Sequence, residues 1–137
     1  MVDESGSIGS SNFAKMKSFL SQLVSRLDID SGKTRVGLVT YATAVRTRFN
    51  LNAYTTVASV QSAISALSYA RGNTDTAAAL AHVRTSMLTS AAGDRTNVPN
   101  FVVILTDGQS DSRPSTRVSL IRCFFLSAII TPVSMLI

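Results

Sequence analysis

The stretch from Asn100 to Thr106 is apolar at almost every position, and Asp107 follows it directly. A strand with one face in water alternates apolar and polar residues, whereas a strand covered on both faces is apolar nearly throughout. The stretch therefore predicts a parallel strand in a sheet that carries helices on both sides. In such sheets ligands bind beyond the carboxyl ends of the strands, where Asp107 stands.

Five further segments have the periodicity of helices or strands. Apolar residues recur every three to four positions, as in amphipathic helices, over residues 11–27, 56–67 and 75–88. Two stretches rich in β-branched residues, 34–40 and 44–49, are joined by a short link and predict an antiparallel hairpin. The alternation predicts an α/β fold: a doubly wound, mostly parallel sheet flanked by helices, with a Rossmann-like arrangement.

The N-terminal loop carries oxygen groups at alternate positions. Asp3, Ser5 and Ser7 lie two residues apart, and Gly6 and Gly9 allow the backbone angles of a tight loop. Oxygen groups in such a loop can converge on one point and suit hard cations such as Mg²⁺ or Ca²⁺. Taken alone, a loop of this kind more often serves only to cap the following helix, for which Ser10 or Ser11 is the expected cap.

Two more oxygen-bearing positions decide between these readings. Thr74 lies in the loop Gly72-Asn73-Thr74-Asp75-Thr76 before a helical stretch, and Asp107 ends the apolar strand. With these, the sequence resembles the von Willebrand factor type A domain, the inserted domain of integrins included. That family carries a metal-ion-dependent adhesion site that reads D-x-S-x-S, then a lone Thr, then an Asp after a hydrophobic strand. The resemblance assigns these roles to Asp3, Ser5, Ser7, Thr74 and Asp107.

The resemblance implies a binding module without catalysis. Ser5, Ser7 and Thr74 would hold Mg²⁺ (or Mn²⁺ or Ca²⁺) directly, and Asp3 and Asp107 directly or through water. An open coordination position would take a Glu or Asp of an extracellular protein ligand, such as the matrix protein collagen. The stretches Asp-Glu-Ser-Gly-Ser-Ile-Gly and Thr-Asp-Gly-Gln-Ser look like those of the secreted, matrix branch of the family, as in matrilins and type VI collagen. Two alternatives remain open: an intracellular module for protein assembly, and a non-functional fragment of a larger protein.

The chain departs from the family pattern at both ends. The family begins with a hydrophobic strand that runs through the middle of the sheet, and here only Met1 and Val2 precede Asp3. We therefore expect the first strand to be missing. We also expect a partial domain over residues 1–112 and an out-of-family apolar tail over 113–137. The tail could be a membrane anchor, a replacement strand centred on 128–131, or an unrelated terminus of a truncated chain.

Composition narrows the other function classes. With 137 residues and 45% hydrophobic content, the chain is one globular domain. Its net charge of +5 is modest, and we expect no nucleic-acid partner. Arg46 and Arg48, with Lys33 and Arg35 on the preceding strand, would either bind a polyanion or protect an edge strand from pairing. Enzyme chemistry is not expected, because the lone His82 has no acidic neighbour on its helix and no G-x-S-x-G occurs.

Overall fold

The computed structural model describes residues 1–107 and 127–132, which form a five-stranded sheet with helices on both faces. The strand order is β3-β2-β1-β4-β5. All neighbouring pairs are parallel except β2 and β3, which form the expected antiparallel hairpin. The predicted α/β fold with a mostly parallel sheet is confirmed. The strands are β1 (Val2–Asp3), β2 (Leu38–Tyr41), β3 (Val45–Phe49), β4 (Phe101–Thr106) and β5 (Ser127–Pro132).

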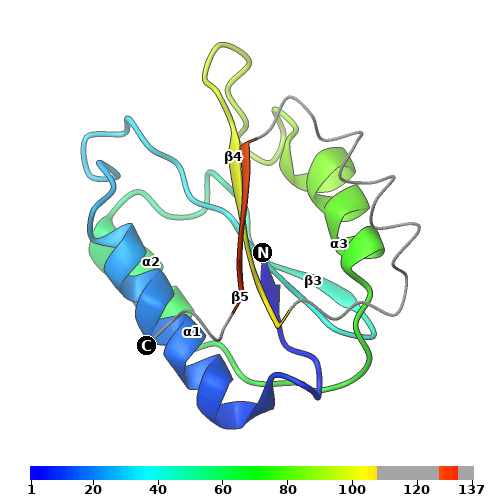
Figure 1. The fold of residues 1–137 in the computed structure, drawn as a ribbon. Coiled ribbons are helices and arrows are strands. Elements are labelled where there is room, and N and C mark those ends of the chain that lie inside the picture. The colour runs from blue at the N-terminus through cyan, green and yellow to red at the C-terminus, as the bar shows by residue number, and fades with distance from the viewer. Residues whose placement is uncertain (108–126, 133–137) are drawn as a thin grey trace.

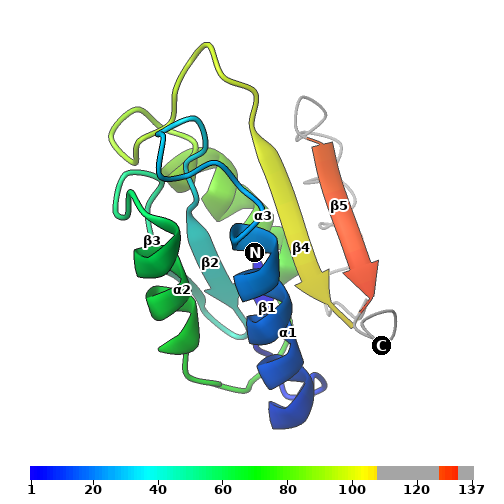
Figure 2. The same ribbon diagram turned by 90° about the vertical axis from the view of Figure 1, so that its left-hand side faces the viewer.

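The helices divide into two layers. Helices α1 (Gly9–Val24) and α2 (Val57–Ser65) lie side by side over one face of the sheet. Helix α3 (Thr76–His82) covers the other face, as Figures 1 and 2 show, and continues as a π-helical turn, η1 (Val83–Met87). The predicted helix over 75–88 is thus one continuous segment, whose last part has wider hydrogen-bond spacing.

Each helix layer makes its own core against the sheet. On one side the apolar stripe of α1, which includes Phe13, Met16 and Leu20, packs with α2 and with Leu105 of β4. On the other side Leu80 of α3 packs with η1 and with the alternate residues of β2 and β4. Because β4 supplies side chains to both cores, it has to be apolar at successive positions.

The helix starts differ from the sequence expectation in one place. Helix α1 begins at Gly9, and Ile8 at its N-cap position makes no side-chain capping bond, so the prediction of Ser10 or Ser11 as the cap is wrong. The preceding loop instead folds its own oxygen groups together. Helix α2 has a capping box between Thr56 and Ser59, and Asp75 caps α3 through its bond from the Ala78 amide.

Strand β1 is short but present. Val2 pairs with Thr40 of β2 on one side and with Leu105 of β4 on the other, so the expected loss of the whole strand is wrong. The amide of Leu105 donates to the Met1 carbonyl (3.0 Å), and the Met1 amino group donates to the carbonyl of Val103 (2.7 Å). Strand β1 therefore joins β2 to β4 only near their carboxyl ends.

The hairpin is shorter than its sequence pattern. Strand β2 begins at Leu38, so Lys33 and Arg35 lie in the preceding loop and not on the strand, contrary to expectation. Lys33 forms an ion pair with Asp28 (3.1 Å). Arg35 donates to the carbonyl of Gly93 (2.7 Å). Both basic side chains of this loop are therefore paired with an acidic or carbonyl group of the described chain.

A strand also occurs in the C-terminal stretch. Strand β5 pairs in parallel with β4 along its whole length, from Phe101 opposite Ser127 to Thr106 opposite Pro132. The replacement strand centred on 128–131 is thereby confirmed. In the part of the chain that the structure describes, no helix is long and apolar enough to cross a membrane. The rest of the expected tail, including its start at 113, lies outside the described residues.

Candidate metal site at the carboxyl edge of the sheet

Asp3 ends β1 and is fully buried. One of its carboxylate oxygens accepts a hydrogen bond from the Ser5 amide (2.8 Å), and the other accepts from the hydroxyl of Thr106 at the end of β4 (2.8 Å). These bonds fix the carboxylate between two neighbouring strand ends. Because an sp² oxygen has two lone pairs, each oxygen keeps a second lone pair for a further partner.

The hydroxyls of the first loop point toward each other. The Ser5 and Ser7 hydroxyl oxygens lie 3.1 Å apart, although Ser5 is buried and Ser7 is exposed. Tyr69 fixes this loop from outside, since its hydroxyl donates to the Ser5 carbonyl (2.6 Å) and accepts from the Gly9 amide (3.0 Å). Phe13 supports the Tyr69 ring, with ring centroids 5.2 Å apart.

The loop before α3 is attached to the first loop through its backbone. The Gly6 amide donates to the Gly72 carbonyl (2.8 Å), and the Asn73 amide donates to the hydroxyl of Thr43 (3.0 Å). Gly72 has a φ of 124°, and a Cβ there would lie 2.5 Å from the Thr43 hydroxyl oxygen. Only glycine suits that position. Thr74, buried two residues later, is therefore held at the same edge of the sheet as Ser5.

Asp107 follows β4 and is half-buried. Burial raises the pKa of Asp3, the hydrogen bonds from Ser5 and Thr106 work in the opposite direction, and the nearby charge of Asp107 raises it further. Two carboxylates that repel each other at one edge are a setting in which a bound cation would be favourable. Tyr41 lies close by, and burial, with the Asp3 charge, raises the pKa of its phenol.

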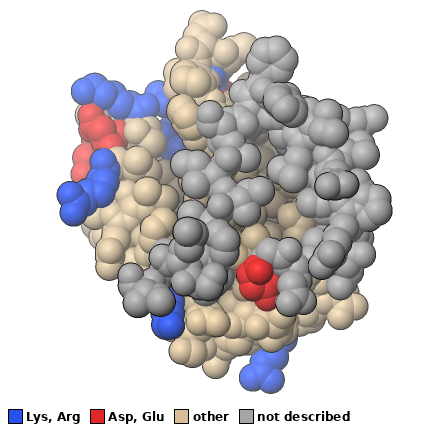
Figure 3. All heavy atoms as spheres, viewed as in Figure 1, with Lys and Arg blue, Asp and Glu red and all other residues tan. Residues whose placement is uncertain are grey.

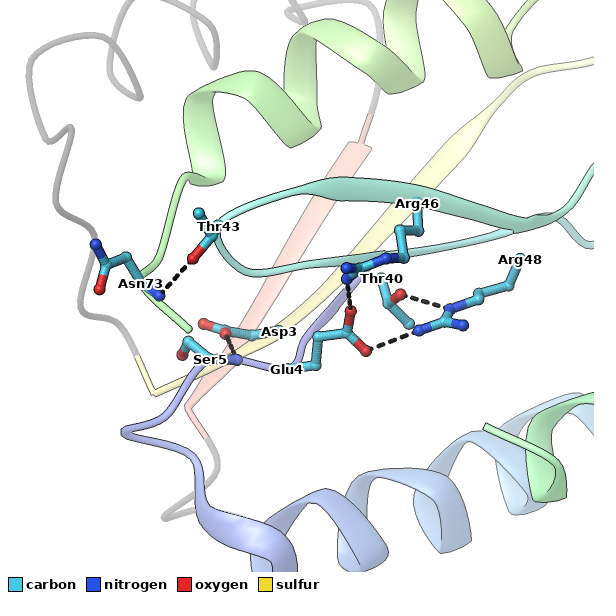
Figure 4. A network of polar contacts seen from close by, with 8 residues as sticks. All are labelled: Asp3, Glu4, Ser5, Thr40, Thr43, Arg46, Arg48 and Asn73. Atoms are coloured by element: carbon cyan, nitrogen blue, oxygen red, sulfur yellow. Dashed lines mark hydrogen bonds and ion pairs between the residues drawn. The ribbon is translucent and has the colours of Figure 1, made fainter. Parts of the chain in front are cut away.

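Glu4 points away from this edge, as Figure 4 shows, and takes no part in it. Its carboxylate is fully buried and forms ion pairs with Arg46 (2.9 Å) and Arg48 (3.0 Å) of β3. Arg48 also donates to the hydroxyl of Thr40 (2.7 Å). Sequence reasoning left Glu4 without a role, because no local signal shows that a residue 42 to 44 positions away supplies its partners.

These pairs bear on the polyanion hypothesis. Arg46 and Arg48 lie on β3, the first strand in the sheet order, and both bind an internal carboxylate, that of Glu4. On the face shown in Figure 3, Lys and Arg side chains are scattered along the margins, with acidic side chains beside them at the left. That face offers no uniformly basic surface among its described residues.

The predicted site residues therefore gather at one edge. Asp3 ends β1, Ser5 and Ser7 lie in the loop after it, Thr74 precedes α3, and Asp107 follows β4. His82 lies elsewhere, at the end of α3, where its ring nitrogen is 2.7 Å from the Thr47 hydroxyl.

The donor chemistry at this edge fits a hard divalent cation. Carboxylate and hydroxyl oxygens are the ligands that Mg²⁺ prefers. Among the described residues, no three or more His, Cys, Asp or Glu side chains form a cluster that could hold a metal ion, so the hydroxyl groups are an essential part of the proposed ligand set. The buried hydroxyl of Tyr41 has no hydrogen-bond partner among the described residues, and such a group marks a place where a ligand or water completes the network.

Comparison with known proteins decides the family. The model of the von Willebrand factor type A domain matches residues 1–131. The chain belongs to this family. Similar proteins include the mouse collagen alpha-4(VI) chain, 41% identical over 112 residues, and human matrilin-4, 40% identical over 113 residues. Each alignment covers 80% of this chain, but only 5% of the collagen and 18% of the matrilin.

Solved structures of the type A fold superpose closely. Proximal thread matrix protein 1 of the mussel byssus gives a TM-score of 0.83 at 26% identity, covering 94% of this chain and 35% of that one. The manganese-loaded TRAP protein of Plasmodium vivax gives 0.82 at 20% identity, covering 96% and 55%. The collagen and matrilin relatives are extracellular matrix proteins, and the expected extracellular location of the type A domain is confirmed.

Proposed function

We propose that this type A domain binds Mg²⁺ at the carboxyl edge of its sheet and, through the metal, an acidic side chain of an extracellular protein. Ser5, Ser7 and Thr74 would hold the ion directly, and Asp3 and Asp107 directly or through water. Mn²⁺ or Ca²⁺ could replace Mg²⁺. At the coarser level, relatives from matrix proteins and metal-binding structural neighbours support a metal-dependent adhesion domain and not an enzyme.

The burial of Asp3 is the observation that carries the proposal. A carboxylate fully removed from water is unfavourable unless it is paired, and Asp3 has hydroxyl and amide donors but no cationic side chain in an ion pair with it in the described part of the chain. The family provides a precedent, since one crystal form of the mussel byssus protein is described as having a zinc-occupied metal-ion-dependent adhesion site.

The ligand set also indicates which partner would bind. Among the five proposed ligands only Asp3 and Asp107 are acidic, whereas the other three are neutral hydroxyls. A metal ion held by so few carboxylates attracts a further one, because Mg²⁺ prefers hard oxygen ligands. A Glu or Asp of a matrix protein such as collagen supplies that group. The proposal assigns this binding to the partial type A domain over residues 1–112.

Metal titration tests the first half. Adding Mg²⁺ or Mn²⁺ should raise the melting temperature. At a metal concentration one hundred times Kd, the free energy of unfolding should increase by about 2.7 kcal/mol. Asp3→Asn and Asp107→Asn should abolish the rise. Asp28→Asn is the matched control, because Asp28 lies in the loop after α1 and pairs with Lys33. Equal shifts in all four proteins would exclude this edge as the metal site.

Capture of matrix proteins tests the second half. The domain should retain a collagen or another matrix protein on a column in Mg²⁺ and release it in EDTA. Single Glu→Gln or Asp→Asn changes in the captured protein should identify one acidic residue whose loss prevents capture. If capture survives both EDTA and every such change, the binding surface lies elsewhere, and the β3 edge with Arg46 and Arg48 is the next surface to test.

A further inference from the structure

The side chain of Tyr41 lies beside the proposed metal edge. Tyr41 ends β2 and pairs with Asp3 of β1. On the other side of β1, the hydroxyl of Thr106, at the end of β4, donates to the Asp3 carboxylate (2.8 Å). Paired residues of neighbouring strands carry their side chains on the same face of the sheet. Tyr41, Asp3 and Thr106 therefore form a row across three strand ends, which we call the carboxyl-end row.

The carboxyl-end row lies on the face of the sheet that α3 covers. Val39, two residues before Tyr41 in β2, packs in the core beneath α3. Ile104 has the same place before Thr106 in β4. Side chains two positions apart in a strand point to the same face. Thr76, the first residue of α3, is buried as well, so the row is enclosed between the sheet and the start of this helix.

The hydroxyl of Tyr41 has no hydrogen-bond partner in the part of the chain that the structure describes, although the residue is fully buried. Burial raises the pKa of the phenol, and the charges of Asp3 and Asp107 raise it further. The hydroxyls of Thr76 and Thr106 act in the opposite direction. The phenol therefore stays protonated at neutral pH, with one O–H to donate and lone pairs that can accept.

A buried phenol without a partner is unfavourable, because it has lost its hydrogen bonds to water. Most buried polar groups in folded proteins are paired, so this one indicates a partner that the described chain does not supply. Its neighbours Asp3 and Asp107, both proposed metal ligands, only accept hydrogen bonds when they are ionised. A group that lies among a phenol oxygen and two carboxylates can satisfy them all by donating, and a water molecule polarised by a cation is a strong donor.

We propose that Tyr41 is a positioning residue of the metal edge, whose hydroxyl accepts a hydrogen bond from a water molecule that Mg²⁺ keeps when it binds there. Mg²⁺ gives up its waters reluctantly, whereas Ca²⁺ takes more oxygen ligands in flexible arrangements. The contact through water therefore favours Mg²⁺ over Ca²⁺. This inference rests on the proposed function, because it needs a cation at the edge that Asp3 and Asp107 form.

Tyr41→Phe removes the hydroxyl and keeps the ring. In EDTA this variant should melt at the same temperature as the wild type or higher, because a buried polar group without a partner is lost. When Mg²⁺ is titrated and binding is followed by the melting temperature, its Kd should be about tenfold higher, as for other residues that support metal ligands. The Kd for Ca²⁺ should rise clearly less.

Tyr54→Phe is the matched control. Tyr54 packs edge-to-face on Phe49, with ring centroids 5.1 Å apart. Phe49 pairs with Leu38, at the other end of β2 from Tyr41, so this hydroxyl lies away from the carboxyl-end row. The control variant should bind both metals as the wild type does.

The comparison separates this inference from the proposed function. A Tyr41→Phe protein that binds Mg²⁺ as tightly as the wild type, or that loses affinity for Mg²⁺ and Ca²⁺ equally, would overturn the inference and leave the metal site standing. A Tyr41→Phe protein that melts well below the wild type in EDTA would also overturn it, and would assign the hydroxyl a structural role. A wild type that responds to neither metal would overturn the inference and the proposed function together.

Discussion

At the scale of single residues, the adjacent acids Asp3 and Glu4 have opposite roles. Asp3 turns to the carboxyl edge of the sheet, the proposed metal site, where hydroxyl and amide groups bond to it. Glu4 turns to the hairpin, where two arginines bind it (Figure 4). Successive side chains of a strand point to opposite faces, so neighbours in sequence enter different environments. One acid is therefore available to a cation, and the other fixes β3 to the start of the chain.

Glu4→Gln should destabilise the fold without affecting metal binding. The change leaves two arginines without their anion, and breaking a buried pair costs roughly 3–5 kcal/mol. Because Arg46 is 47% exposed and can return to water, we expect about 2 kcal/mol. Urea unfolding measures the loss, and Asp28→Asn, which breaks the exposed pair with Lys33, should change stability far less. A Glu4→Gln protein as stable as wild type would contradict this role.

The amino group of Met1 should make stability depend on pH. Burial lowers its pKa from 8.0 to about 5, so between these values the unfolded chain binds more protons than the folded one. Stability then rises with pH from 5 to 8, by up to about 4 kcal/mol at 1.36 kcal/mol for each pKa unit. Acetylating this amino group should remove that part of the pH profile. Identical profiles for the free and acetylated chains would contradict the burial of a titrating amine.

At the scale of elements, helix α2 is held at its start by local bonds. The Thr56 hydroxyl accepts from the Ser59 amide (3.2 Å), and the Val57 amide donates to Asp30 (3.0 Å), which connects the helix to the loop after α1. These bonds satisfy amides that the helix itself leaves without partners. The sequence analysis did not predict the capping box, although the helix that it predicted begins at Thr56.

Thr56→Ala should cost about 1 kcal/mol, the usual loss for an N-cap. Thermal or urea unfolding gives the difference, and Thr55→Ala is the control, because Thr55 is exposed and makes no capping bond. Equal destabilisation by both changes would mean that the cap does not hold α2.

At the scale of the whole molecule, β1 joins β2 to β4 near the carboxyl ends of these strands, and an apolar cavity of about 510 Å³ lies between β2 and β4 beyond β1. A cavity lined by apolar groups removes packing contacts that a core normally has. We therefore expect this chain to be only marginally stable and prone to aggregate through its incompletely paired strands.

Adding Val-Ile-Val before Met1 should fill this cavity from within the chain. The added strand buries apolar side chains and pairs with β2 and β4, and we expect the melting temperature to rise by roughly 5 °C or more and unfolding to sharpen. Ser-Gly-Ser in the same place controls for length and should not stabilise. A sharp, unchanged transition in all three proteins would show that this cavity does not weaken the fold.

The sequence determined the strand of Phe101–Thr106, the apolar helix faces and the positions of the five proposed ligands. The strand and the helix faces follow from local pattern, because a strand buried on both faces is apolar throughout and an amphipathic helix repeats every three to four residues. The five ligands follow from the resemblance of their motifs to those of the family. The family and fold that the motifs indicated are confirmed. The metal itself, the ligand roles and the domain boundary at 112 stay predictions.

Only the tertiary structure decided the rest. The pairing of Glu4 with Arg46 and Arg48 depends on how the hairpin lies beside β1, because the two arginines are 42 and 44 residues away from Glu4 in sequence. The cavity between β2 and β4 depends on the register of β1 against these two strands, and the two residues of β1 carry no sequence pattern that predicts this register. Both are properties of contacts between distant segments, and no local periodicity records such contacts.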